Sequence, residues 1–216
     1  MSEPRTLLVI AGEFPPLKTI GRIRTVKFVE QLRQHGWRSI VITLQPSGNE
    51  GNYDPSLMAE IADGVEVVRV PLRTSEENIA NGVKRLLGRK PASPAAVSAG
   101  AATGGVAVAT RAAPAAATGG GLLDRAHATT RWVLRNLVDV PDDFRPWASD
   151  ALKVARRLCA ERHIDAVYTT LPPFSSMLVG HDLRRETGLP WIADYRDLWY
   201  GDVLREWVPE WRKKLE

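Results

Sequence analysis

The chain has 216 residues, of which 44% are hydrophobic and 25% are charged, and its formal net charge at pH 7 is +4. These values are typical of a soluble globular protein, and the length allows one large domain or two small ones. No stretch reaches the roughly 18 consecutive apolar residues that cross a bilayer, and the N-terminal residues lack the pattern of a secretion signal. The single cysteine, Cys159, excludes an internal disulfide and fits a reducing cytoplasm.

Strands and helices alternate over the first third of the chain. Short apolar runs predict strands, and apolar residues that recur at close to helical spacing predict a helix between the first two. The predicted elements are strands over Arg5–Ala11, Arg38–Leu44 and Val65–Val70, a helix over Arg22–His35 and a short helix over Pro55–Asp63. Gly36 is well placed to end the longer helix. A strand, a helix and a strand at this spacing form a βαβ unit, which predicts a parallel sheet with right-handed crossovers.

The pattern breaks at residues 91–121, which are almost entirely Ala, Gly, Ser, Thr, Val and Pro. Such a segment buries too little apolar surface to offset the entropy lost on ordering it, so we expect a disordered insertion. Residues 1–90 are then the first part of a single Rossmann-like domain, and residues 122–216 are the second part of the same domain.

Basic residues gather on both sides of this insertion. Residues 76–137 contain eight basic and three acidic residues, and helices are expected over Asn78–Leu87 and Leu122–Val138. A basic amphipathic helix with a tryptophan, here Trp132, can lie on an anionic membrane surface. The alternative is that these helices pack on the domain and expose their arginines to solvent.

Regular structure returns after residue 142. The predicted elements are helices over Trp147–Arg162 and from the Pro172–Pro173 turn to Gly188, and strands over Ala166–Thr170 and Pro190–Ala193. The last residues, from Trp211 onward, are typical of the first turn of another helix. Together these elements predict an α/β fold, a Rossmann-like open parallel sheet with helices on both faces.

Candidate binding residues follow the first predicted strand. In open α/β sheets, ligands bind beyond the carboxyl ends of the strands. The N-terminus of a helix at that place suits an anion such as phosphate, Gly21 allows close approach of the backbone, and Arg22 or Arg24 adds positive charge. The loop matches neither the GxGxxG fingerprint nor a Walker loop, which counts against a classical dinucleotide site or P-loop.

Hydroxyl groups gather after the fourth predicted strand. Thr170, Ser175 and Ser176 lie near the start of a helix, where they could contact a sugar or a phosphate. Routine capping of the helix by serine is the alternative interpretation.

Charged side chains follow the fifth predicted strand. Asp194, Arg196 and Asp197 come after an apolar run, where a carboxylate can orient a hydroxyl or act as a base and an arginine can clamp a phosphate. In the alternative interpretation, Asp194 and Arg196 merely pair with each other in a solvated loop. The spacing of the histidines does not suggest metal ligands, so we expect no dedicated metal site.

Three segments of the chain together resemble a known family. The first segment contains FPP (14–16), GRIR (21–24) and VKFVEQLRQHGWRSIVIT (26–43). The second is AVYTTLPPFSS (166–176), and the third is GLPWIADYRDLW (188–199). Their combination is similar to the N-terminal half of a GT-B glycosyltransferase, closest to the family-four retaining enzymes, over about residues 5–72 and 142–200. Thr19 stands where relatives commonly carry the first glycine of a Gly-x-Gly pair, and Gly21 stands at the second. Arg196 and Asp197 fall at the places of the His-Asp pair of many relatives.

The resemblance implies a division of labour between two domains. This domain would hold the acceptor, a similar C-terminal domain would hold the nucleotide-sugar, and sugar transfer would occur between them without a bound metal or other cofactor. Together with the strand-end positions described above, this gives Asp194, Arg196 and Asp197 as the candidate catalytic residues and Gly21, Arg22, Arg24, Thr170, Ser175 and Ser176 as the candidate substrate-binding residues. Because arginine stays charged at neutral pH, Arg196 is expected to position the acceptor or a phosphate and not to transfer a proton.

The activity implied is transfer of a sugar to a glycan or lipid-linked acceptor in polysaccharide or glycolipid synthesis, with no nucleic-acid partner. The expected location is the cytoplasm, at the inner face of the membrane. The chain shows no donor-site glycine loop and no Glu-x7-Glu segment, so we expect a half-enzyme truncated before its donor domain, with little activity alone.

Two other classes of protein remain open. One is a non-catalytic module of the same fold that binds a membrane or a partner through its basic helices. The other is a different Rossmann-type enzyme with a nucleotide cofactor, against which the missing glycine fingerprint counts. The sugar-transfer interpretation requires Gly21, Ser175 and Arg196 to lie around one shared hollow.

Overall fold

The protein is built on an open parallel β-sheet, seen in a computed structural model that describes residues 4–73, 137, 140–198 and 210–214. The strand order is β3-β2-β1-β4-β5, and every neighbouring pair is parallel. The strands are β1 (Arg5–Ile10), β2 (Trp37–Gln45), β3 (Glu66–Pro71), β4 (Ala166–Leu171) and β5 (Trp191–Tyr195). The predicted Rossmann-like α/β fold is therefore confirmed.

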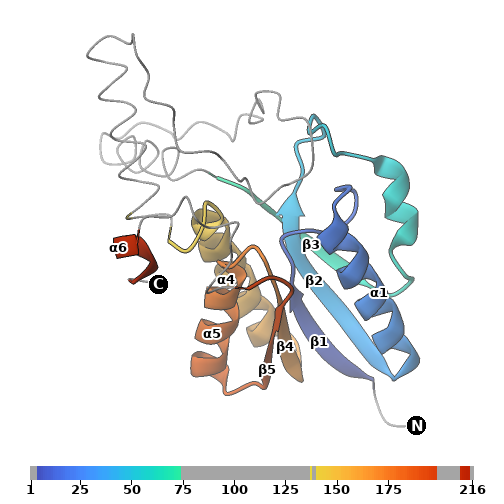
Figure 1. Ribbon diagram of the computed structural model, residues 1–216. Coiled ribbons are helices and arrows are strands. Elements are labelled where there is room, and N and C mark those ends of the chain that lie inside the picture. Colours follow the sequence, from blue (N-terminus) through green and yellow to red (C-terminus); the bar gives the residue numbers. More distant parts are fainter. Residues whose placement is uncertain (1–3, 74–136, 138–139, 199–209, 215–216) are drawn as a thin grey trace, which may run out of the picture.

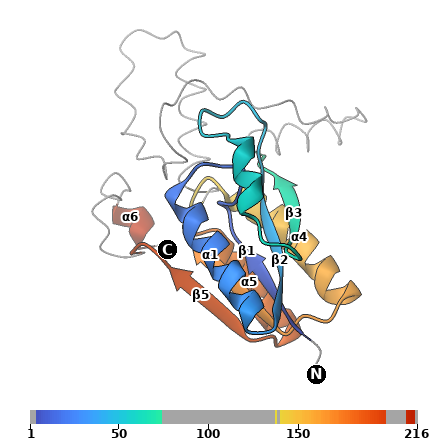
Figure 2. The same cartoon turned by 90° about the vertical axis from the view of Figure 1, so that its right-hand side faces the viewer.

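Helices cover both faces of the sheet (Figure 1). Helix α1 (Ile20–Gln34) lies on one face, and α4 (Arg145–Glu161) and α5 (Ser176–Thr187) lie on the other, as the turned view also shows (Figure 2). The short 3₁₀ helix η1 (Pro55–Glu60) follows β2, and α6 (Glu210–Lys213) is the last described helix. Right-handed crossovers explain this arrangement, because the chain moves from β1 to β2 in one direction and from β4 to β5 in the other.

Several predicted segments lie outside the described residues. They are the insertion at 91–121, the helix at 78–87, and the helix at 122–138 apart from residue 137. Within the part of the chain that the structure describes, no helix is long and apolar enough to cross a membrane.

Alternate side chains of β1 enter two different cores. Leu8 and Ile10 pack in the core beneath α4 and α5, whereas Leu7 and Val9 pack in the core beneath α1. Because successive strand residues point to opposite faces, a strand that is covered on both faces is apolar at nearly every position. This explains the continuous apolar run of β1, which is the central strand.

Helix α1 begins two residues before its predicted start because Thr19 caps it. The Thr19 side chain accepts a hydrogen bond from the backbone nitrogen of Arg22 at 3.3 Å, which satisfies one of the free amide groups of the first turn. The chain leaves the helix through His35 and Gly36, and the Gly36 φ of 76° is one that glycine adopts readily. The amino end of α1 is thereby fixed at the carboxyl edge of the sheet.

Strand β5 extends two residues beyond its predicted end, which corrects the expected position of Asp194. The strand ends at Tyr195, so Asp194 lies within the sheet, opposite Thr170 of β4. A charge within a strand is costly unless it is paired and hydrogen-bonded. That cost is offset here because Arg24 and Tyr168 both donate hydrogen bonds to the Asp194 carboxylate.

The strand order places a switch point between β1 and β4. From β1 the chain continues toward β2 and β3, and from β4 it continues toward β5 on the opposite side. The loops after β1 and β4 run apart at such a point, which is where α/β proteins bind ligands. Asp142 supports one of these loops, because it accepts hydrogen bonds from the backbone nitrogens of Ser175 and Phe144, each at 3.1 Å.

Candidate functional site

An ion pair between two loops forms the centre of the candidate site. Nη1 of Arg196, which follows β5, lies 3.3 Å from Oε2 of Glu13, which follows β1. Nη2 of Arg196 donates a hydrogen bond to the backbone carbonyl of Pro172 in the loop after β4. The Arg196 amide donates to the Leu171 carbonyl at 2.9 Å. Loops after β1, β4 and β5 therefore meet at one guanidinium group, at the switch point of the sheet.

Gly21 lies directly against this ion pair. A Cβ atom added at Gly21 would lie 1.8 Å from both Nη1 of Arg196 and Oε2 of Glu13, so neither group could keep its position. The sequence predicts that Gly21 lets a ligand approach the backbone of α1. In the structure, the side chains of Glu13 and Arg196 occupy that place.

Burial raises the pKa of the Glu13 carboxyl above its ordinary value of 4.5, because the charged form loses hydration. The charge of Arg196 and hydrogen bonds from Arg196 and Thr19 oppose this effect, whereas the charge of Asp197 adds to it. The side chains of Glu13 and Arg196 are 11% and 14% exposed. The pair is thus largely enclosed by protein but still reaches the surface.

Asp194 is separate from this pair, although it is close to Arg196 in the sequence. Nε and Nη2 of Arg24 donate to its two carboxylate oxygens at 2.9 and 2.6 Å, and the Tyr168 hydroxyl donates to Oδ2. Burial and the Asp194 carboxylate raise the pKa of Tyr168, so its hydroxyl stays protonated and remains a donor. The Tyr168 ring stacks on Phe28 of α1 with 4.4 Å between centroids. Asp194 and Arg24 therefore fasten α1 to β5, and Asp194 pairs with Arg24 instead of Arg196.

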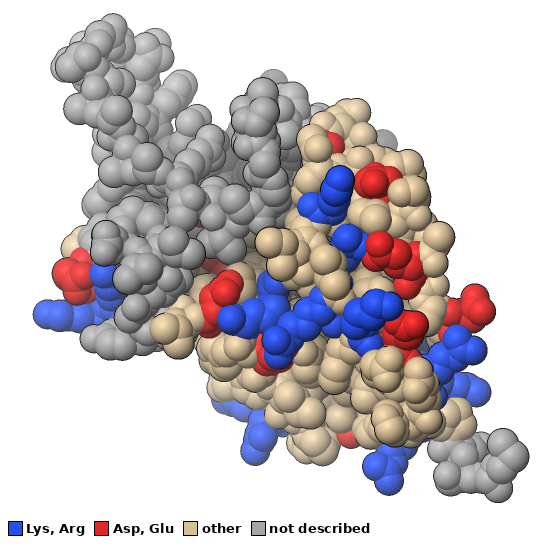
Figure 3. Space-filling model, turned by 45° about the vertical axis from the view of Figure 1, so that its right-hand side comes forward, with Lys and Arg blue, Asp and Glu red and all other residues tan. Residues whose placement is uncertain are grey.

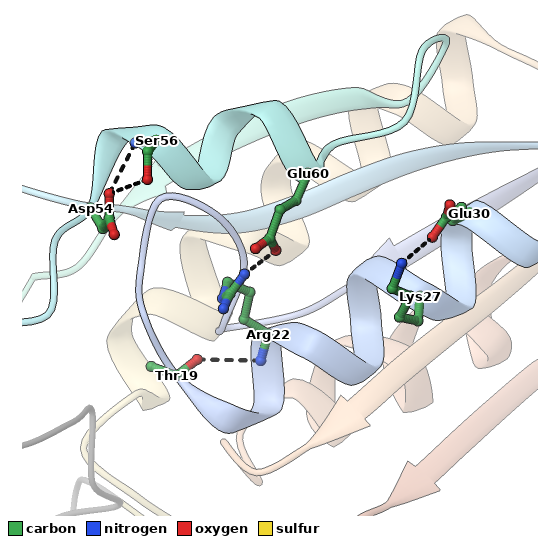
Figure 4. Close-up of polar contacts among 7 residues, drawn as sticks. All are labelled: Thr19, Arg22, Lys27, Glu30, Asp54, Ser56 and Glu60. Carbon is green, nitrogen blue, oxygen red and sulfur yellow. Dashed lines mark hydrogen bonds and ion pairs between the residues drawn. The ribbon is translucent and has the colours of Figure 1, made fainter.

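Arg22 is also paired within the protein. Its side chain points from the first turn of α1 to Glu60 at the end of η1, and it is only 7% exposed (Figure 4). The start of η1 is capped by Asp54, which accepts a hydrogen bond from the Ser56 backbone nitrogen at 3.0 Å. Arg22 thus attaches η1 to α1, and its charge is already compensated by a carboxylate.

The three predicted hydroxyl residues lie in the interior. Thr170, Ser175 and Ser176 are 2%, 0% and 0% exposed. The Ser175 hydroxyl donates to Asp142 and does not cap α5. The hydroxyls of Thr170 and Ser176 have no hydrogen-bond partner among the described residues. The loop that carries Ser175 borders the site, but a ligand at the surface would not reach these three side chains.

Glu13 is the site residue that the sequence interpretation missed. It is the only acidic residue between β1 and α1, and it follows a buried strand at the edge where ligands bind. These two properties could have identified it. Of the three residues expected around one hollow, Gly21 and Arg196 adjoin Glu13. The loop that carries Ser175 reaches the same place through the Pro172 carbonyl, so all three positions lie at one edge of the sheet, although the Ser175 side chain itself is turned to Asp142.

One face of the molecule carries both signs of charge. Figure 3 shows Lys and Arg side chains in a band across one face, with Asp and Glu side chains beside them. On α1, the side chains of Arg24 and Lys27 are 59% and 68% exposed. Asp197 is exposed and adds negative charge near Glu13. A ligand at the site therefore meets mixed charges and not a uniformly positive field.

The described residues offer neither a metal-binding cluster nor a reactive cysteine. The described residues include no cluster of three or more His, Cys, Asp or Glu side chains suited to a metal ion. Cys159 packs against the core on the α4 side of the sheet, and burial raises the pKa of its thiol. A raised pKa suppresses the reactive thiolate, so Cys159 is a structural residue.

The fold and the site define an α/β protein with a polar site at the switch point of a parallel sheet. The sequence matches no protein-family model and no curated protein sequence. Among solved structures, the chain is similar to the C-terminal domain of a hydrogenase from Pyrococcus furiosus. The identity is 10%, the TM-score is 0.41, and the match covers 90% of this chain and 92% of that one. A similarity at this level carries no argument about function.

Proposed function

We propose that the protein is the acceptor-side domain of a glycosyltransferase that moves a sugar from a nucleotide-sugar to a glycan or lipid-linked acceptor. The observation that carries the proposal is the meeting of Glu13, Arg196 and Gly21 at the switch point of the sheet. A carboxylate beside a guanidinium suits the hydroxyls of a sugar, because one accepts hydrogen bonds and the other donates them. The segments that resemble family-four GT-B enzymes include Gly21 and Arg196.

In the proposed reaction, the polar groups at the switch point hold the acceptor and orient its reactive hydroxyl. Arg196 donates hydrogen bonds to acceptor oxygens, and the exposed Asp197 beside it accepts one from a hydroxyl. Asp194 acts as a positioning residue, because both oxygens of its carboxylate accept hydrogen bonds from Arg24 and Tyr168. The sugar comes from a nucleotide-sugar bound by a second domain, with no metal or cofactor in the proposed scheme.

A carbohydrate-binding experiment with the 216-residue chain tests the proposal. We expect the chain to bind glycans or glycolipids on an array and to lose this binding in Arg196→Gln. The control variant is Arg38→Gln, which removes an exposed arginine of β2, and it should bind as the wild type does. Absence of carbohydrate binding by the wild-type chain would overturn the proposal.

A turnover assay addresses whether the chain acts alone. We expect it to hydrolyse or transfer no sugar nucleotide without a donor-binding partner. Robust turnover would overturn that expectation, because the chain would then bind the nucleotide-sugar itself.

A non-catalytic membrane- or partner-binding module is the second candidate, because α1 exposes apolar side chains beside basic ones. Ile20 and Ile23 are 89% and 50% exposed, and Arg24 and Lys27 follow them at helical spacing. Such a surface can lie on anionic lipid at the cytoplasmic face of the inner membrane, the location proposed for either candidate. Sedimentation with phosphatidylglycerol vesicles, lost when Ile20 and Ile23 become serine and without carbohydrate binding, would favour the module.

A further inference from the structure

The ion pair also indicates which chemical class of ligand the site accepts. Free amide groups and the helix dipole favour an anion at the amino end of α1, which is why the sequence predicts a phosphate there. In the structure, an anion of the protein itself lies against Gly21, namely the Glu13 carboxylate. The amino end of α1 is therefore already compensated before any ligand arrives.

The charges around Arg196 disfavour a second anion. Glu13 lies 3.3 Å from the guanidinium, and the charge of Asp197 is close enough to raise the pKa of Glu13. The arginines of the first two turns of α1 are each paired with another carboxylate. A phosphate in contact with Arg196 would lie beside two carboxylates and be repelled by both, whereas a neutral ligand avoids this repulsion.

The pair keeps hydrogen-bonding capacity that a neutral ligand can use. A guanidinium carries five N–H donors, and in Arg196 the two terminal nitrogens contact Glu13 and the Pro172 carbonyl. A carboxylate offers about four acceptor positions, and Glu13 receives a hydrogen bond from Arg196. A hydroxyl both donates and accepts, so neighbouring hydroxyls of one sugar ring match both groups without adding charge.

We infer that the Glu13–Arg196 pair binds the hydroxyl groups of an uncharged sugar and excludes phosphate from the amino end of α1. The inference rests on the proposed function and deepens it. The acceptor binds to this pair through an uncharged sugar ring. Any phosphate of the donor or of a lipid carrier binds elsewhere.

Saturation-transfer NMR on the full chain tests the inference without the natural acceptor. The probes are the methyl glycosides of glucose, galactose, mannose and rhamnose, and the competitors are inorganic phosphate and pyrophosphate. We expect at least one methyl glycoside to bind the wild-type chain, and neither anion to displace it. Displacement by either anion, or no binding of any methyl glycoside, would overturn the inference.

Glu13→Gln connects the binding to the ion pair, because it keeps the shape of the side chain and removes its charge. We expect glycoside affinity to fall about tenfold or more, the effect of losing a hydrogen bond to a charged group, and phosphate to bind where it does not bind the wild type. The control is Glu30→Gln, which removes a partly exposed carboxylate of α1 and should change neither affinity.

A second variant covers the case in which Glu13→Gln does not fold, as judged by circular dichroism. Arg196→Lys keeps the positive charge but loses the planar fork of donors, so glycoside affinity should fall by a similar factor. Unchanged glycoside affinity in a folded variant of either kind would contradict the inference.

The result also separates this inference from the proposed function. If phosphate binds at the pair in the wild type while the glycan array is still positive, the inference fails and the acceptor-side assignment stands. If the array is negative for the wild type, the assignment itself fails.

Discussion

Glu13 is a carboxylate whose surroundings favour its charged form less than water does. Its pKa is raised even though Arg196 lies 3.3 Å away and donates a hydrogen bond to it. An enclosed ion pair gains electrostatic attraction but loses the hydration of both groups, and the loss can exceed the gain. Displaced pKa values of this kind gather at functional sites, which agrees with a ligand-binding role for Glu13.

The displaced pKa predicts how the contribution of Glu13 to stability depends on pH. Because the folded-state pKa lies above 4.5, the folded protein holds the Glu13 proton more tightly than the unfolded chain does. Its contribution is therefore fully present below the unfolded-state pKa and is lost as pH rises through the folded-state pKa. Urea denaturation measures this effect. As pH rises over this range, the free energy of unfolding of the wild type should decrease relative to that of Glu13→Gln. A wild-type free energy of unfolding that stays constant or increases relative to that of Glu13→Gln would contradict the prediction.

The two carboxylates at the end of β5 are expected to differ in their effect on stability. Asp194→Asn breaks a bidentate ion pair with Arg24 and weakens the hydrogen bond from Tyr168, so it should lower the free energy of unfolding by about 2 kcal/mol. Asp197→Asn, the control, changes an exposed side chain and should alter stability much less. Equal effects of the two variants in urea denaturation would show that Asp194 does not fasten α1 to β5.

At the scale of elements, α5 approaches the sheet closely because it has a glycine at the contact. A Cβ atom added at Gly180 would lie 2.1 Å from Nε1 and 2.5 Å from Cε2 of Trp191, and 2.8 Å from Cγ2 of Thr169. The Trp191 indole also donates a hydrogen bond to the Thr169 hydroxyl at 3.1 Å, which fixes the ring. The helix, β4 and β5 therefore interlock at one small residue.

This contact reverses the usual effect of replacing glycine by alanine in a helix. Alanine is favoured in a helix by about 1 kcal/mol, but Gly180→Ala should destabilise the protein by about 1–3 kcal/mol because the indole and Thr169 have to move. Gly51→Ala is the control for steric space, since Gly51 lies in a turn where an added Cβ atom would meet nothing within 4 Å. Thermal denaturation measures both, and a stabilised Gly180→Ala variant would contradict the packing described.

The elements were largely predictable from the sequence, and their ends were less so. Apolar runs and helical spacing are local properties, so the five strands and the main helices of the described region follow from them. The end of β5 was misplaced because Asp194 is tolerated in the strand only through partners on α1 and β4. Sequence periodicity contains no information about such distant partners.

At the scale of the whole molecule, two cores share the same strands. Leu8 belongs to the core beneath α4 and α5, and Val9 belongs to the core beneath α1, although they are neighbours in β1. Neither core can lose its packing without disturbing the strand that supports the other. The described domain is therefore expected to unfold as one cooperative unit.

Substitutions in the two cores test this cooperativity. Leu8→Ala should lower the free energy of unfolding by about 2–5 kcal/mol, and Val9→Ala should also destabilise the protein, since both side chains are 0% exposed. Each variant should shift a single urea transition, with the same midpoint by circular dichroism and by tryptophan fluorescence. Separate midpoints would show that the two faces of the sheet unfold independently.

The location of the candidate site in the fold was predictable from the sequence, whereas the residues that form it were not. Parallel strands place their carboxyl ends at one edge, so residues after β1, β4 and β5 were expected together, and Gly21 and Arg196 do adjoin. Arg22 and Arg24 appeared to be available for a ligand because their carboxylate partners are distant in the sequence. Which charges are compensated depends on tertiary contacts, and these decide what a site offers to a ligand.

Glu13 and Arg196 are 183 positions apart along the chain. They come together only in the native domain, so denatured polypeptide offers a small molecule neither group in the required geometry. Any compound that binds to both side chains stabilises the folded domain and raises its melting temperature, by an amount that grows with the logarithm of the compound's concentration. A thermal-shift screen of a carbohydrate library can thus reveal what this edge of the sheet recognises, with no catalytic assay at all.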